Sequence, residues 1–365
     1  MYVLSICIPT FNRAAKLNST LEAISKEIRG LPVEICISDN GSADDTQKVI
    51  SKWKHVLPIS SRKNETNMGY DMNMVQTLWL AEGEFAMCCG DDDAFVEGSL
   101  ARLVADLSSA DKEVGAVYLN SLKNGVPVTS FDFTRFSVFR KDGDYAPLAL
   151  SFGGAICLRT KVARDVINEK IYAEGDRLLK READTLMLFS FVHTYLFLEC
   201  CSRTGSLGIE PSCVVRILGI GQTISITKRF FFDLIFNIYY LQIRMKYPWI
   251  KESIYLDEGG IAKHIFKRYF ALAYMLNNRP DLKDAFRTNY AVSLKILKMN
   301  NRFLAVIFQA LAVTRVLPLI GIVCIDAYKA IFGRKDFLSE NTDNVGIPSK
   351  SVDDFFTYAR KYQGV

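Results

Sequence analysis

The sequence has few of the residues that build the most common catalytic and metal sites. Only three of its 365 residues are histidines, His55, His193 and His264, and they lie far apart without H-E-x-x-H or other ligand spacing. The nine cysteines form no C-x-x-C pair and lie mostly within apolar runs, unlike the ligands of zinc sites. This pattern is typical of reduced core thiols in a cytosolic protein. Carboxylates are left as the main candidates for a reactive site.

The chain also lacks a strong net charge. With 45 basic and 40 acidic side chains, its formal charge is +5, which is too small to indicate a nucleic-acid partner but suits an anionic substrate or membrane surface. No basic stretch or cleavage site accompanies the apolar segment after Met1, so we expect a strand there and no signal peptide. No internal repeat or flexible linker is present, and 49% hydrophobic residues are enough to bury a full core.

Short apolar runs alternate with amphipathic stretches over the first hundred residues. The apolar runs predict strands at residues 2–8, 33–38, 56–60 and 84–89. The amphipathic stretches predict helices at about 14–28, 43–54 and 70–81. Strands separated by helices need crossover connections, which indicates an α/β fold with a mostly parallel, Rossmann-like sheet flanked by helices. Ligands of such sheets bind at the carboxyl ends of the strands.

Polar side chains follow the first two predicted strands. In "PTFNR", Pro9 is expected to stop the strand, and Thr10 and Asn12 offer donors to a phosphate or a base at the start of a helix. In "SDNGSADD", Ser42 and Asp45 have the spacing of a capping box for the next helix.

Asp39, at the mouth of the second strand, then has no capping role. It is expected to accept a hydrogen bond from a pyrimidine base or a ribose hydroxyl. An ordinary turn aspartate is the alternative, because Asp is common in turns.

Three carboxylates in a row, Asp91, Asp92 and Asp93, follow the fourth predicted strand. Adjacent negative charges repel one another, so this placement is unfavourable unless a positive group offsets it. Mg²⁺ and Mn²⁺ bind a few carboxylate oxygens and take their other ligands from water and substrate phosphates. The triplet therefore predicts a complex of a divalent cation with a diphosphate.

Four motifs, "SICIPTFNR", "ICISDNGSADDT", "NMGYDMN" and "GDDDAFVEGSL", occur in this order within about the first 110 residues. Together they resemble the nucleotide-sugar domain of family 2 glycosyltransferases, which are inverting enzymes with a GT-A fold. With "GGA" near residue 154 and a helical C-terminal part, the pattern is similar to bacterial O-antigen transferases of the abequosyltransferase kind.

The resemblance implies roles for individual residues. Nucleotide-binding roles fall on Pro9, Thr10, Asn12, Asp39, Asn67, Gly69, Asp71, Asp91 and Asp92. Gly90 stands where many members have the first Asp of the metal motif, so the ligands of Mn²⁺ or Mg²⁺ fall on Asp92 and Asp93. Asp91 is then expected to contact the metal ligands without binding the metal itself.

Inversion needs one further carboxylate, because the acceptor hydroxyl must lose a proton as it attacks the anomeric carbon. In the family, a single Asp or an E-D-like motif before a helix holds this catalytic base. The stretch "LLKREADTLMLFSF" (178–191) offers Asp184 as the first candidate and Glu182 as the second. The alternative is that both are acids favoured at a helix start by the helix dipole.

Long helical patterns replace the alternation beyond about residue 227. We therefore expect a nucleotide-sugar-binding and catalytic domain at 1–226 and an α-helical C-terminal region at 227–365. Residues 303–332 are apolar, but charged residues and Pro318 interrupt them, which excludes a transmembrane helix. Two interfacial helices hinged at Pro318 would give a peripheral contact with the cytoplasmic face of the inner membrane. Core helices or a dimer face are the alternative.

Together these features predict a metal-dependent inverting glycosyltransferase. Its donor would be a nucleotide-diphosphate sugar and its acceptor a lipid-linked saccharide of bacterial surface polysaccharide. A sugar nucleotidyltransferase is one alternative, although a Gly-rich phosphate loop is expected there in place of "PTFNR". A non-catalytic, membrane-associated assembly protein with the same fold is the other. The base, the sugar and the linkage are left open.

Overall fold

A computed structural model of the chain describes residues 1–146, 148–150, 153–172, 192–217, 247–250, 294, 297–298 and 302–313. The chain divides into two compact units. The first comprises Met1–Ile220, Trp249–Ser253 and Tyr362–Val365, and the second comprises Gly221–Pro248 and Ile254–Lys361. The predicted domain boundary at 226/227 lies outside the described residues.

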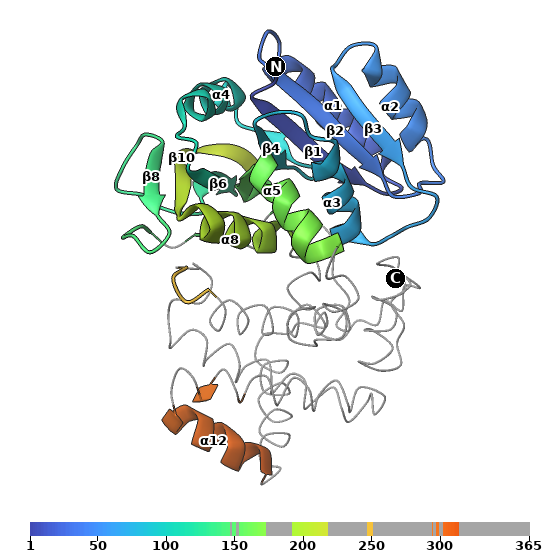
Figure 1. The fold of residues 1–365 in the computed structure, drawn as a ribbon. Helices are drawn as coiled ribbons and strands as arrows, with labels where there is room; N and C mark the ends of the chain where they lie inside the picture. Colours follow the sequence, from blue (N-terminus) through green and yellow to red (C-terminus); the bar gives the residue numbers. More distant parts are fainter. Residues whose placement is uncertain are drawn as a thin grey trace. The chain divides into compact units, whose positions relative to one another are not determined.

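Within the described residues of the first unit, ten strands form one sheet (Figure 1). They are β1 (Leu4–Thr10), β2 (Val33–Asp39), β3 (Ile59–Lys63), β4 (Phe85–Cys88), β5 (Ala94–Phe95), β6 (Val114–Lys123), β7 (Val126–Pro127), β8 (Ser137–Arg140), β9 (Ile156–Arg159) and β10 (Ser206–Ile217). The order is β3-β2-β1-β4-β9-β6-β10-β5, with β7 beside β6 and β8 beside β10.

The direction of the strands decides where a ligand site can form. β3, β2, β1 and β4 run parallel to one another, as do β6 and β10. The short β9 is antiparallel to both β4 and β6, so those two strands point the same way. The carboxyl ends of all six parallel strands therefore meet at one edge of the sheet.

Helices cover both faces of the sheet. They are α1 (Ala14–Glu27), α2 (Thr46–Lys54), α3 (Tyr70–Leu80), α4 (Ser99–Ser109), α5 (Thr160–Val166) and α8 (Val192–Thr204). On one face, Ile6 and Ile8 of β1 form a core cluster with Leu17 and Leu21 of α1 and with Leu103 of α4. On the other face, α3 packs on β1 and β2, and α8 packs on β6 and β9 (Figure 1). Because both faces are covered, every residue of β1 and β2 is buried.

The predicted α/β fold is confirmed, and each strand and helix expected in the first hundred residues is present. β3 begins at Ile59 instead of residue 56, because the N–H groups of Val56 and Leu57 both donate to the Trp53 carbonyl in a turn that ends α2. Pro9 does not stop β1. The Cys7 carbonyl accepts from Cys89, so Pro9, two residues later, faces the side on which pairing with β4 has ended, and no ladder bond is lost.

The expected capping box of α2 is wrong. The helix begins at Thr46, and neither Ser42 nor Asp45 forms a side-chain cap. Asp44 accepts the Thr46 N–H at 3.1 Å instead. Ser42 Oγ is already the acceptor of the Asn12 N–H, which joins the loops after β1 and β2.

The described cysteines are free thiols, as predicted, and all but Cys213 are buried. Burial raises the pKa of the Cys88 thiol to about 12, so this thiol stays protonated at neutral pH.

In the second unit the structure describes one full helix, α12 (Arg302–Val313), in which Ala305 and Phe308 are buried while Phe303 and Val306 are exposed. In the described part of the chain, no helix is both long and apolar enough to cross a membrane. The hinge expected at Pro318 lies outside the described residues.

A buried carboxyl in β10 makes the stability of the fold depend on pH. Glu210 is 3% exposed, and burial, together with Asp106, raises the pKa of its carboxyl from 4.5 to about 7. Between those pH values the folded chain keeps a proton that the unfolded chain releases, so stability is full below this window and is lost as pH rises through it. We expect the free energy of unfolding to fall by about 3 kcal/mol across it. Glu210→Gln, which still accepts from the Ser212 N–H, is expected to remove most of this fall.

Urea denaturation at several pH values tests this expectation. Tryptophan fluorescence reports on the first unit, since Trp53, Trp79 and Trp249 all lie there. Glu22→Gln is a matched control, because that carboxyl is 56% exposed, and it should leave the pH profile unchanged. An identical profile for wild type and Glu210→Gln would contradict the assignment.

Candidate functional site

The ends of β1, β2 and β4 bring predicted site residues together. Thr10 pairs with Asp39 across the sheet, and Cys7 pairs with Cys88 just before the acidic triplet. Thr10 Oγ1 donates to Asp91 Oδ2 at 2.8 Å. The end of the first strand and the triplet are therefore in contact, as the topology predicts.

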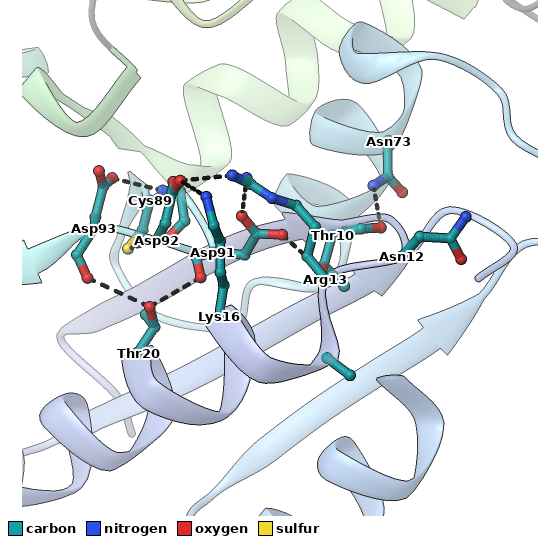
Figure 2. A network of polar contacts seen from close by, with 12 residues as sticks. Thr10, Asn12, Arg13, Lys16, Thr20, Asn73, Cys89, Asp91, Asp92 and Asp93 are labelled. Carbon is teal, nitrogen blue, oxygen red and sulfur yellow. Dashed lines mark hydrogen bonds and ion pairs between the residues drawn. The ribbon is translucent and has the colours of Figure 1, made fainter. Parts of the chain in front are cut away.

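Two basic side chains from the start of α1 offset the charge of the triplet (Figure 2). The Arg13 guanidinium donates to Asp91 Oδ1 and, at 2.6 Å, to Asp92 Oδ2. Lys16 Nζ lies 3.0 Å from the same Asp92 oxygen. Sequence reasoning missed both residues. The available signal was two cations at a helix start, where the helix dipole disfavours positive charge, directly after a strand at the ligand edge.

The three carboxyls of the triplet differ in their electrostatic surroundings. Burial raises the pKa of Asp93 to about 6. Burial also raises the pKa of Asp91, against the opposing effects of Thr10 and Arg13. At Asp92 burial acts in the same direction, but Lys16 and Arg13 outweigh it and lower the pKa. Asp92 is thus firmly ionised, and Asp93 is the carboxyl that gains most from an added positive charge.

The carboxyls of Asp92 and Asp93 both lie close to Gly90. A Cβ added to Gly90 would lie 3.3 Å from Asp92 Oδ1 and 3.1 Å from Asp93 Oδ2. The Gly90 N–H donates to Asp93 Oδ2 at 2.6 Å. The missing side chain at Gly90 therefore leaves space beside both carboxyl groups.

Asp92 and Asp93 are the candidate metal ligands among the described residues. Among them, no group of three or more His, Cys, Asp or Glu side chains is arranged to hold a metal. One or two carboxylates suit Mg²⁺ or Mn²⁺ when substrate phosphates and water complete the coordination. Asp92 and Asp93 thus fit a cation that arrives with a diphosphate.

A groove of about 490 Å³ opens beside the triplet. It is lined by Ala15, Lys16, Ser19, Thr20, Ala23, Asp92, Asp93 and Ala94. Small side chains on α1 leave this space open. Thr20 Oγ1 donates to the Asp91 carbonyl at 2.9 Å, which fastens the triplet to α1. The groove gives a ligand access to Lys16 and to both predicted metal ligands.

Asn40 holds the predicted nucleotide-closing segment in place. Its Nδ2 donates to Asn67 Oδ1 at 2.7 Å and to the Gly69 carbonyl at 3.2 Å, and its Oδ1 accepts from the Met68 N–H at 2.8 Å. Gly69 has a φ of +82°, which favours glycine, and it directly precedes α3. The sequence indicates Asn40 only as a turn residue, but the structure makes it the anchor of this segment.

Two other predicted nucleotide contacts have partners within the chain. Asp39 is fully buried, and its carboxylate accepts from the Ser42 N–H at 2.9 Å and from Gln47 Nε2 at 2.6 Å. Asn12 Oδ1 accepts from the Ala43 N–H at 2.8 Å. Both side chains therefore fix the turn that follows β2.

Asp71 joins α3 to α8. Its carboxylate accepts from the Val192 N–H at 3.2 Å, at the first described residue of α8. The base candidates Asp184 and Glu182 precede this helix in the sequence and lie outside the described residues.

Comparison with known proteins gives a family match. A model described as "Glycosyl transferase family 2" matches residues 5–166. The abequosyltransferase RfbV of Salmonella typhimurium is 40% identical over 110 residues, which cover 29% of this chain and 33% of that protein. The GalNAc(5)-diNAcBac-PP-undecaprenol beta-1,3-glucosyltransferase of Campylobacter jejuni is 34% identical over 104 residues, which cover 28% of this chain and 33% of that protein. The matched stretch thus spans about a third of each relative.

Solved structures show a weaker likeness. The mannosyltransferase PcManGT from Pyrobaculum calidifontis, in complex with GDP-Man and Mn²⁺, has a TM-score of 0.48 at 14% identity, with 91% of this chain and 88% of that chain covered. S. aureus TarS 1–349, in complex with UDP-GlcNAc, has a TM-score of 0.45 at 15% identity, with 80% and 89% covered. These scores are low, and the sheet and helices described above establish the fold by themselves.

Proposed function

We propose that the protein is an inverting glycosyltransferase, since residues 5–166 match the model described as glycosyl transferase family 2. It transfers a sugar from a nucleotide-diphosphate donor to a saccharide acceptor of the bacterial cell surface. The observation that carries this proposal is the position of the Asp92 and Asp93 carboxyls beside Gly90, at the sheet edge where ligands of parallel sheets bind.

The reaction needs positive charge at the leaving group, because a diphosphate gains negative charge as the bond to the sugar breaks. Asp92 and Asp93 would hold Mn²⁺ or Mg²⁺, which when bound supplies Lewis-acid stabilisation of that charge. Asp91 takes no part as a ligand in this proposal. It accepts hydrogen bonds from Thr10 and Arg13 and so keeps the triplet in place.

The nucleoside is proposed to lie over the ends of β1 and β2. Asn67 and Gly69, held by Asn40, would close over it. Asp39 and Asn12 are proposed to shape this pocket through the turn that they fix, and Asp71 through the start of α8.

The acceptor hydroxyl must give up a proton to a carboxylate within hydrogen-bond reach. Asp184 is the proposed base, with Glu182 as the second candidate. The name of the Campylobacter relative specifies an undecaprenol-linked acceptor, which supports a lipid-linked acceptor here. Such an acceptor would require peripheral contact with the cytoplasmic face of the inner membrane.

A thermal-shift screen of UDP, CDP, GDP and dTDP with Mn²⁺ tests the proposal. One nucleoside diphosphate is expected to raise the melting temperature of the first unit by a few degrees, because a ligand at about 100 times its Kd adds about 2.7 kcal/mol of stability. A sugar nucleotidyltransferase would instead be stabilised by a nucleoside triphosphate and would exchange pyrophosphate. If none of the four diphosphates shifts the melting temperature, the proposal is wrong.

A further inference from the structure

Arg13 and Lys16 are the cations that accompany the acidic triplet in the structure (Figure 2). Both approach Asp92 Oδ2, at 2.6 Å and 3.0 Å respectively. The other Asp92 oxygen, Oδ1, lies beside Gly90, as does Asp93 Oδ2. Oδ2 of Asp92 is therefore paired with basic side chains, and Oδ1 is available to a metal ion.

Arg13 and Lys16 are placed so that they can leave the carboxylates and bind phosphate oxygens instead. Arg13 is 38% exposed and Lys16 is 48% exposed, and Lys16 lines the groove beside the triplet. Asp92 is 42% exposed as well, and exposed ion pairs contribute little to stability, so little is lost when its pairs with Arg13 and Lys16 break. Asp91 is only 3% exposed, but it keeps Thr10 as a hydrogen-bond donor when Arg13 leaves. A diphosphate also carries more negative charge than one carboxylate, and guanidinium and ammonium groups both bind phosphate oxygens well.

We propose that Arg13 and Lys16 bind the diphosphate of the donor, and that they occupy the carboxylates of Asp91 and Asp92 when no nucleotide is bound. The inference rests on the proposed function and extends it to two residues of this chain. Without nucleotide, the two cations repel a divalent ion from Asp92 and Asp93. With nucleotide, they move to the phosphate oxygens, and they no longer repel the ion from Asp92 and Asp93.

The consequence is a coupling between two ligands. Mn²⁺ is expected to bind weakly to the protein alone and more tightly when a nucleoside diphosphate is present. Because coupling between binding sites is reciprocal, Mn²⁺ must strengthen nucleotide binding by the same factor, which we expect to be about tenfold or more.

The test compares the wild type with the double variant Arg13→Gln/Lys16→Gln. Mn²⁺ binding is measured by electron paramagnetic resonance, with and without the nucleoside diphosphate that the thermal screen identifies. Nucleotide binding is measured by calorimetry in EDTA and in Mn²⁺. In the variant we expect the nucleotide in EDTA to bind about tenfold more weakly and Mn²⁺ alone to bind several-fold more tightly. The coupling factor is expected to fall several-fold, and the part that remains comes from direct coordination of Mn²⁺ by the phosphates.

The double variant Lys26→Gln/Lys48→Gln is the matched control, since it removes the same charge at side chains that are 71% and 81% exposed. It should bind both ligands as the wild type does. Circular dichroism verifies that both variants are folded, and if the first does not fold, Lys16→Gln alone replaces it with smaller changes in the same directions.

The outcomes separate this inference from the proposed function. If the wild type binds none of the nucleoside diphosphates, the proposed function fails. If the wild type binds one of them and the double variant shows the same affinities and the same coupling, Arg13 and Lys16 only support the fold, and the inference is overturned.

Discussion

Replacing Asp93 by Asn is expected to lower donor turnover about a thousandfold or more, while the melting temperature stays the same or rises. The variant keeps the shape of the side chain and an acceptor for the Gly90 N–H but removes the negative charge. Burial raises the pKa of Asp93 to about 6, so holding this charge at neutral pH costs folding free energy. A residue that weakens the fold and is needed for the reaction gives opposite effects on stability and activity.

The measurement is kcat/KM with a labelled sugar donor, together with a melting curve. Asp142→Asn is the control, because this carboxyl is 57% exposed and pairs with Arg140 on the surface. It should change neither quantity. Asp92→Asn provides a second variant at a half-exposed position and should lose turnover similarly. Wild-type turnover in Asp93→Asn would refute the proposed metal site.

The second large effect concerns stability. Arg159, at the end of β9, is 8% exposed and contacts residues at the starts of two neighbouring strands, β4 and β6. Its guanidinium donates to the carbonyls of Val114 and Asp111 at 2.7 Å and 2.6 Å, and to Glu84 at 2.6 Å. It also lies over the Phe85 ring, 4.4 Å from the centroid.

Arg159→Met keeps an apolar stem of similar length but removes the guanidinium donor of the buried Val114 carbonyl, whereas the Asp111 carbonyl still accepts from the Val114 N–H. We expect the free energy of unfolding of the first unit to fall by about 3 kcal/mol, because a buried acceptor without a partner loses its hydration without compensation. Tryptophan fluorescence in a urea titration measures this change. Arg140→Met is the control, since that side chain is 84% exposed, and its change should be close to zero. Equal losses in the two variants would contradict the assigned role of Arg159.

The sequence predicts the first half of the sheet well because each strand there is a short apolar run buried on both faces. The boundary of β3 is less predictable, since hydrogen bonds to Trp53, and not hydrophobicity, decide where α2 ends. The capping box fails for a similar reason. Ser42 fits the pattern, but Asn12, thirty residues earlier, uses its hydroxyl as an acceptor.

The candidate site is likewise predictable from the sequence only in part. The topology places Thr10 beside the acidic triplet, and local pattern is enough to find both. The pairing of Arg13 with Asp91 spans 78 residues of sequence and depends on the rotamers of two side chains, which no periodicity encodes. Asn40 is likewise visible only as a turn residue, because its partners near Asn67 come from another loop.

The place of β9 in the sheet sets the order in which the protein can assemble during synthesis. This strand lies between β4 and β6 but comes from residues 156–159, so β4 has an open edge until the ribosome has released them. An unpaired strand edge is a template for association with other chains. The nascent protein is therefore most exposed to aggregation after its first four strands have formed and before β9 reaches them, which is the interval in which a chaperone would protect it.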